Sequence, residues 1–199
     1  WKGHLDKLLA TPSKVAKGEH HAALDYRQAG AFMADLRGQA GVGARALEFV
    51  VLAAARSGEV RGATWAEFDL VAATWTIPAE RMKATKEHRI PLAPEAVALL
   101  RALPLFAGAD YVFASPRGGQ LSDMTLSAVI KRMHVAETKA GRKGYVDPKQ
   151  FDKDGNPKIA TPHGFRSTFR DWAGETTAYP REVIEHALAH RLKDKTEAA

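Results

Sequence analysis

Apolar side chains recur every three or four residues along much of the chain, which is the period of an amphipathic helix. The stretch 44–55 is apolar on nearly all sides and predicts a helix buried in the core that ends at Arg56-Ser57-Gly58. The predicted helices cover 26–37, 44–55, 59–65, 94–103, 122–133, 163–175 and 180–189. The last of these is expected to turn inward Val183, Ile184, Ala187 and Leu188.

Two further regions lack this helical period. Short alternating stretches separated by turn residues predict a small antiparallel sheet with strands at 74–77, 81–83 and 88–92. Lys83 would then lie at the hairpin end of the second strand. The stretch 137–161 is rich in Gly, Pro and charge and predicts a surface loop. The expected fold class is therefore α+β, a mainly helical domain with a small three-stranded antiparallel sheet.

The size and charge of the chain narrow its class. Its 199 residues are 45% hydrophobic, which suits one sizeable domain or one domain with a remnant of another. We expect a linker over 1–21, where lysines and Pro12 interrupt any apolar period, and the domain itself over 22–199. This basic segment would either lie along DNA or be a solvated linker. The net charge of +6 favours a polyanionic partner.

Cysteine content and hydropathy exclude several other classes. The chain has no cysteine, which excludes disulfides, thiolate zinc sites and a cysteine nucleophile and favours a cytosolic setting. No apolar run approaches the roughly 20 residues that span a bilayer, so we expect no membrane partner.

A gapped set of cationic residues suits the chemistry of a phosphodiester. Guanidinium groups are always charged and form paired hydrogen bonds with phosphate oxygens. Fixed donors gain most when negative charge grows on those oxygens in a transition state. The candidate residues are Arg56, Lys83, His163, Arg166 and His190. Glu59 lies one turn after Arg56 and is expected to orient it.

The pair His186 and His190 allows one competing interpretation. Their spacing of four residues places both on one helix face, as in zinc-binding pairs. The metalloprotease signature, however, has Glu directly after the first His, and here Ala187 follows His186. We therefore expect no metal and interpret His186 as a surface or supporting residue.

Five short stretches are each weak signals, but their order and spacing are specific. They are Ala-Arg-Ser-Gly-Glu-Val-Arg-Gly-Ala-Thr-Trp (55–65), Trp-Thr-Ile-Pro-Ala-Glu-Arg-Met-Lys (75–83), His-Arg-Ile-Pro-Leu (88–92), Thr-Pro-His-Gly-Phe-Arg (161–166) and Glu-Val-Ile-Glu-His-Ala-Leu-Ala-His (182–190). Together they resemble the catalytic domain of tyrosine recombinases, in the prophage and genomic-island integrase branch. The resemblance extends from about His21 to the C-terminus.

This resemblance implies a role for each candidate residue. Arg56 and Arg166 would hold the two non-bridging oxygens of the scissile phosphate. Lys83 would be the general acid that protonates the departing 5′ oxygen. His163 would position the phosphate or shuttle a proton, and His190 would donate to a non-bridging oxygen. No cofactor is implied, since the two arginines supply the countercharge.

The nucleophile departs from the family pattern. Family members carry a tyrosine on the helix after the Leu-Ala-His segment, yet residues 191–199 contain none. We expect the tyrosine immediately after Ala199, which would make the chain a catalytic domain truncated before its nucleophile and inactive by itself. We assign this role to none of the tyrosines that are present, which are Tyr26, Tyr111, Tyr145 and Tyr179.

The resemblance also implies what the whole protein does. It would integrate a prophage or genomic island by breaking and rejoining double-stranded DNA at attachment sites through a 3′-phosphotyrosyl intermediate. A homotetramer would form the synaptic complex in the bacterial cytoplasm, at the nucleoid, with DNA-bending and excision-directing accessory proteins as further partners. The alternatives are a catalytically inert DNA-binding module and a type IB topoisomerase-like nicking enzyme.

Overall fold

The structure is a computed structural model that describes residues 20–82, 85–104 and 110–190. Lys83, most of the predicted linker and the segment after His190 lie outside these residues. The helices are α3 (Ala29–Arg37), α4 (Val42–Ala53), α5 (Ser57–Arg61), α6 (Pro94–Ala102), α7 (Met124–Lys139), α8 (Gly164–Thr176) and α9 (Arg181–Ala187), with short 3-10 turns at Tyr26–Gln28, Trp65–Glu67 and Ala79–Arg81.

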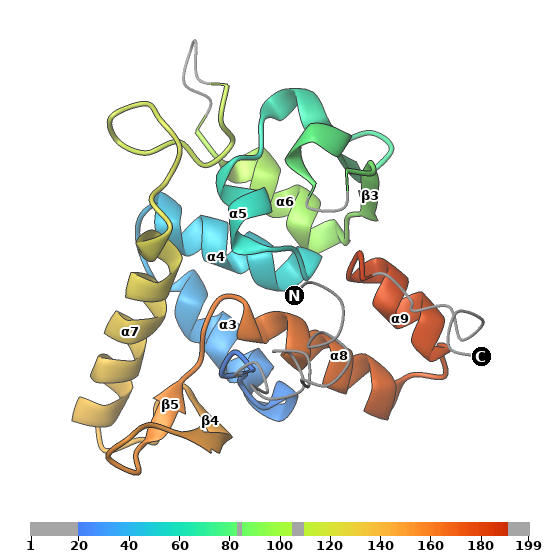
Figure 1. Cartoon of the computed structure of the whole chain (residues 1–199). Helices are drawn as coiled ribbons and strands as arrows, with labels where there is room; N and C mark the ends of the chain where they lie inside the picture. The colour runs from blue at the N-terminus through green and yellow to red at the C-terminus, as the bar shows by residue number, and fades with distance from the viewer. Residues whose placement is uncertain (1–19, 83–84, 105–109, 191–199) are drawn as a thin grey trace, which may run out of the picture.

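Helix α4 occupies the centre of the core, as its apolar sequence predicts. It packs against α3, α5, α6, α7 and α8. Phe49 on this helix is fully buried and contacts the rings of Trp75 and Phe113 at centroid distances of 5.4 and 5.6 Å. Figure 1 shows α4, α5, α6 and β3 grouped on one side, with α3, α8 and the β4–β5 hairpin on the other. This central helix fixes the relative position of the two groups.

A three-stranded antiparallel sheet is present, in the order β1 (Phe68–Asp69), β2 (Thr74–Ile77) and β3 (His88–Pro91). The α+β fold class is thus confirmed, but one predicted strand is wrong. The stretch predicted to begin a strand at Arg81 forms the 3-10 turn Ala79–Arg81 instead. The reason is that Arg81 points inward, where its guanidinium bonds the Glu67 carboxylate and the carbonyl of Glu59.

The predicted loop over 137–161 is also wrong. Helix α7 continues to Lys139, and the chain then forms a hairpin from β4 (Val146–Phe151) and β5 (Pro157–Ile159). Asp152 makes the turn, because its Oδ1 accepts hydrogen bonds from the backbone N–H groups of Asp154 and Asn156, at 2.9 and 2.8 Å. These strands carry polar residues on solvent-exposed faces, so they lack the alternation that identifies a strand in sequence.

The end of α4 and the inward face of α9 also differ from the prediction. Helix α4 ends at Ala53, because Ala54 adopts a left-handed conformation with φ of 48°. Arg56 therefore lies in a short connection, and α5 begins directly after it at Ser57. In α9, Ile184 and Leu188 are buried as expected, whereas Val183 and Ala187 are exposed. This two-turn helix lies at the edge of the molecule (Figure 1), so only one side of it meets the core.

Within the described part of the chain, no helix combines the length and apolar character needed to cross a membrane.

Candidate phosphate-binding site

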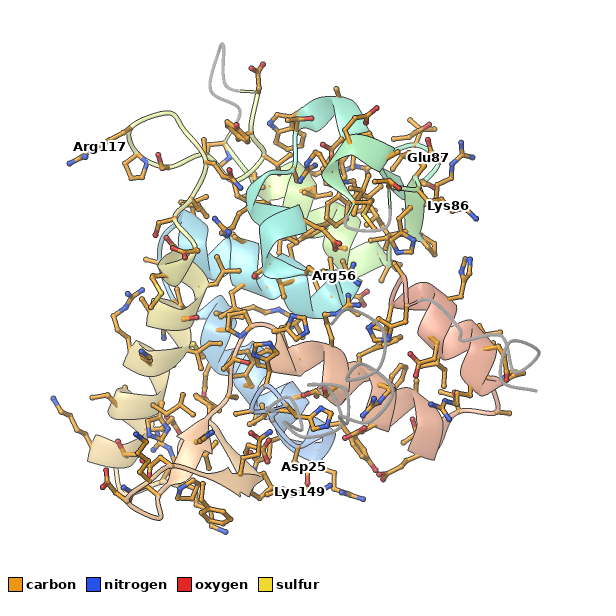
Figure 2. All side chains as sticks on the ribbon, viewed as in Figure 1. Asp25, Arg56, Lys86, Glu87, Arg117 and Lys149 are labelled. Carbon is orange, nitrogen blue, oxygen red and sulfur yellow. The ribbon has the colours of Figure 1, made fainter. Side chains whose placement is uncertain are left out.

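Arg56 lies where the α4–α5 region meets α8 (Figure 2). It is the residue that precedes α5, and the carboxylate of Glu59 holds it in two ways. Glu59 Oε2 accepts the backbone N–H of Arg56 at 2.8 Å, and Oε1 accepts a guanidinium N–H at 2.7 Å. Glu59 is itself buried, with 7% of its surface exposed. This is the geometry expected of a residue that orients Arg56.

Arg166, on the first turns of α8, is a buried cation that backbone carbonyls hold. Only 5% of its surface is exposed, and its guanidinium donates to the carbonyls of Ala54, at 2.7 Å, and Leu188. Among residues 20–82, 85–104 and 110–190, no carboxylate forms an ion pair with it and its Nε–H has no hydrogen-bond partner. Burial is the largest cause that lowers the pKa of Arg166, to about 10, and the positive charge of Arg56 is the second. Such a group is stabilised when an anion enters the site.

The C-terminal end of α9 connects these arginines to the sheet. His88 hydrogen-bonds the backbone of Ala187, the last residue of the helix. Arg166 donates to the carbonyl of Leu188, the residue that follows. Arg56 Nη2 reaches the next carbonyl, that of Ala189, at 3.5 Å. Carbonyls at a helix C-terminus carry partial negative charge, so they hold cationic donors in place without neutralising them. Both guanidinium groups are thereby fixed side by side.

His163 lies just before α8 and shares this site. The pKa of His163 is lowered to about 4, first by partial burial and then by the positive charges around it, including Arg166 and Arg56. The ring of His21 contacts it, with 4.3 Å between centroids. His21 is placed in the linker by sequence reasoning, and no motif marks it as a neighbour of the site. The neutral form of His163 is therefore favoured at neutral pH, beside the charged Arg56 and Arg166.

His190 follows the turn that ends α9 and lies beside Arg166. Its Nε2 is 3.1 Å from Arg166 Nη2, and its Nδ1 is 2.5 Å from the carboxylate of Glu185. The side chain is 39% exposed, so a ligand can reach it from solvent. Glu185 is a second residue that sequence reasoning misses, since nothing in the spacing singles it out. The structure thus brings together Arg56, Arg166, His163 and His190.

The remaining candidates are distributed as follows. Lys83 lies outside the described residues, although Arg81, two positions earlier, bonds to the Glu59 carbonyl of the site. His186 is exposed on α9, and its charge lowers the pKa of His88, for which burial is the larger cause. In the three described ranges, no group of His, Asp and Glu has the arrangement of a metal site.

None of the four tyrosines has a described contact with Arg56 or Arg166. Tyr26 donates its hydroxyl to Glu175 at 2.9 Å, and Tyr145 donates to Asp35. Tyr179 is 67% exposed at the start of α9, and Tyr111 lines an apolar cavity near α6. These placements offer no support for any of them as a nucleophile at the site.

Sequence comparison identifies relatives along nearly the whole chain. The phage integrase family matches residues 23–198. Prophage integrase IntZ of Escherichia coli K12 is 30% identical over 184 residues, which is 92% of this chain and 41% of IntZ. The integrase of Enterobacteria phage P4 is 28% identical over 208 aligned residues, covering 96% of this chain and 43% of that protein. The chain therefore spans about two fifths of the length of these relatives.

Solved structures show the same fold at lower identity. The crystal structure of XerA recombinase covers 98% of this chain and is itself covered to 68%, with a TM-score of 0.58 and 18% identity. A lambda integrase dimer bound to a COC' core site covers 92% of this chain and is covered to 60%, with a TM-score of 0.60 and 19% identity. The fold, the arginine site and the sequence match over residues 23–198 together establish that this chain belongs to the phage integrase family of tyrosine recombinases.

Proposed function

We propose that this chain is the catalytic domain of a site-specific DNA recombinase that integrates a prophage or genomic island. The observation that carries the proposal is the buried guanidinium of Arg166, which lies beside Arg56 and forms no ion pair with a carboxylate among the described residues. The charges of Glu59 and Glu185 only partly offset its burial. A protein tolerates the cost of burying such a charge when the site has an anionic ligand. A DNA phosphate is the ligand that two adjacent guanidinium groups fit best.

The proposed reaction is a phosphoryl transfer at this site. A tyrosine oxygen attacks the phosphorus, and the bond from phosphorus to the 5′ oxygen breaks, leaving a 3′-phosphotyrosyl bond. Arg56 and Arg166 hold the non-bridging oxygens, on which negative charge grows. His163 would position the phosphate or take up the proton that the tyrosine hydroxyl loses on attack, and His190 would donate to a non-bridging oxygen. The ammonium of Lys83 would give its proton to the departing 5′ oxygen, and the reverse reaction with a new 5′ hydroxyl rejoins the strands.

Within this proposal, Glu59 orients Arg56 and the domain extends over 22–199, with 1–21 as its linker. We propose double-stranded DNA containing attachment sites as the substrate and a homotetramer as the synaptic form. Solved relatives support both, because a lambda integrase tetramer is bound to a Holliday junction and the Tn1549 transposon integrase is in complex with a circular intermediate DNA. DNA-bending and excision-directing proteins in the bacterial cytoplasm are the proposed accessory partners.

The test is formation of a covalent adduct on a nicked suicide substrate that carries the attachment site. The full product of the reading frame that encodes this chain should form the adduct, and the 199-residue chain alone should not. Arg166→Ala in the full product should slow cleavage by about 10²–10³-fold, the usual cost of losing one fixed donor to a developing oxyanion.

Arg170→Ala is the matched control, because Arg170 lies one turn further along α8 and is exposed. Cleavage at the normal rate by Arg166→Ala would show that this site takes no part in the reaction. An adduct on the short chain would make one of its own tyrosines the nucleophile. Relaxation of supercoiled plasmid without recombination would favour a topoisomerase-like enzyme, and DNA binding without any cleavage would favour an inert module.

A further inference from the structure

The carboxylate of Glu185 is buried beside the phosphate site, and although Glu185 lies within the 182–190 stretch, the resemblance assigns it no role. Only 8% of Glu185 is exposed, although it lies on α9 at the edge of the molecule. Its Oε2 lies 2.5 Å from His190 Nδ1, and its backbone carbonyl accepts the N–H of His190 at 2.9 Å. Glu185 therefore holds both the ring and the main chain of the same histidine. A buried carboxylate needs such partners to offset its desolvation.

The contacts of the His190 ring assign its tautomer. A carboxylate only accepts hydrogen bonds, so the nitrogen that faces Glu185, Nδ1, carries a proton. A guanidinium only donates, so the nitrogen that faces Arg166 at 3.1 Å, Nε2, offers its lone pair. The two contacts are independent of each other and require the same form, protonated at Nδ1 and bare at Nε2. An isolated imidazole is free to take either tautomer, so this choice comes from the surroundings.

The ion pair with Arg181 does not account for the position of Glu185. Arg181, one turn earlier on α9, approaches Oε1 only to 3.8 Å, and its side chain is 86% exposed. Such an exposed pair contributes little energy. The interaction of Glu185 with His190 is shorter and more buried than its pair with Arg181. His190 also contacts Arg166.

We propose that Glu185 is a positioning residue that fixes the ring of His190, with Nε2 directed at the phosphate held by Arg166 and Arg56. This inference rests on the proposed function of the site. When a DNA phosphate replaces the contact between Arg166 and Nε2, donation from Nε2 requires a second proton on the ring. The Glu185 carboxylate, on the opposite side of the ring, then supplies the countercharge. In this arrangement a carboxylate orients a functional histidine by binding the ring nitrogen that does not face the phosphate.

The tautomer is tested on the 199-residue chain itself, without any reaction. Nitrogen-15 NMR of histidine-labelled protein at neutral pH should show His190 protonated at Nδ1 and bare at Nε2. Glu185→Ala should abolish this preference, and Glu182→Ala, an exposed carboxylate on the same helix, should leave it unchanged. An Nε2-protonated ring in the unaltered chain, or the same spectrum in Glu185→Ala, would overturn the assignment.

The role in catalysis is tested by a double-mutant cycle in the full product of the reading frame. Glu185→Ala should slow adduct formation by about 10–100-fold, by analogy with the loss of a carboxylate that orients a metal-bound histidine. In the His190→Ala background the same change should have no further effect, because Glu185 acts through that ring. Glu185→Gln should recover part of the rate, since its amide oxygen can still accept from Nδ1. A Glu182→Ala variant should cleave normally.

The outcomes separate the two proposals. If the unaltered protein forms no adduct, the proposed function fails, whatever the NMR spectrum shows. If it cleaves and Arg166→Ala does not, but Glu185→Ala cleaves at the normal rate, only the role of Glu185 is overturned. An equal loss from Glu185→Ala with and without His190 would mean that Glu185 acts through Arg166 or through folding, which would also overturn it. Thermal melting of each variant distinguishes folding from function.

Discussion

Inorganic phosphate should bind between Arg56 and Arg166 and raise the thermal stability of the 199-residue chain. Each hydrogen bond to a charged group contributes about 1.5–3 kcal/mol, so one from each guanidinium gives about 3–6 kcal/mol. This range includes the roughly 4 kcal/mol that corresponds to a Kd of about 1 mM. The low pKa of Arg166, about 10, indicates that burial destabilises its charge, which favours anion binding further.

At a phosphate concentration about 100 times the Kd, the stabilisation is about 2.7 kcal/mol. A domain of this size gains about 2–4 °C in Tm for each kcal/mol, so the Tm should rise by about 5–10 °C. Differential scanning calorimetry at about 100 mM phosphate, against sodium chloride of equal ionic strength, measures the shift. Part of any shift is general, because phosphate is excluded from protein surfaces and stabilises folded proteins without binding.

Arg166→Met separates the specific part from the general part. The variant loses hydrogen bonds to the carbonyls of Ala54 and Leu188, at a cost of about 1–3 kcal/mol each. It also removes a buried charge whose lowered pKa corresponds to a cost on the order of 3 kcal/mol, so the variant should stay folded. Its Tm should respond to phosphate much less than that of an Arg170→Met control. An equal phosphate shift in Arg166→Met and the unaltered chain would refute the reasoning.

Three further predictions concern the elements that build the site. Ala54→Gly should stabilise the fold by about 1 kcal/mol in urea unfolding, since its φ of 48° costs residues other than glycine about 1–2 kcal/mol. Ala53→Gly, at the last residue of α4, should instead destabilise the fold by up to about 0.5–1 kcal/mol, and a gain there would contradict the argument. Gly164→Ala should destabilise by more than about 2 kcal/mol in the same assay, because a Cβ there would lie 1.9 Å from the Ala22 carbonyl oxygen, and near-normal stability would show that the two segments do not meet. The pKa of His163 is about 4 in the folded chain, below the value near 6.5 of the unfolded chain, so its contribution to stability is complete above about pH 6.5 and is lost as the pH falls toward 4. Because this ring is only partly buried and solvent screens it, we expect a loss of about 1 kcal/mol, measured as a difference in pH dependence from His163→Gln, and identical pH profiles would contradict the shift.

Local sequence determines the elements that carry the site. The apolar period of 44–55 identifies the central helix, and the alternation around Trp75 and Ile90 identifies two of the three strands. Prediction fails at Arg81, where a side chain turned inward by Glu67 ends the extended backbone, and in the hairpin after α7, whose exposed strands carry no apolar alternation. The first failure arises from contacts with residues distant in sequence, whereas the second arises because the hairpin turn is made by polar side chains that an apolar period does not reveal.

The sequence by itself also determines which residue types are available to the site and in what order they occur. Their resemblance to the integrase motifs is sufficient to name Arg56, His163, Arg166 and His190 together. Sequence does not show that Arg166 is buried without a carboxylate partner among the described residues, that His21 contacts His163, or that Glu185 holds His190.

Those properties depend on the tertiary structure, because burial and electrostatic environment are produced by packing. The strain on the Arg166 charge arises only when α4, α8 and the end of α9 close around it. The tautomer of His190 likewise depends on a carboxylate and a guanidinium that approach its ring from two helices. The sequence determines which groups can react, and the packing of α4, α8 and α9 determines their charge, their orientation and the place where a phosphate can bind.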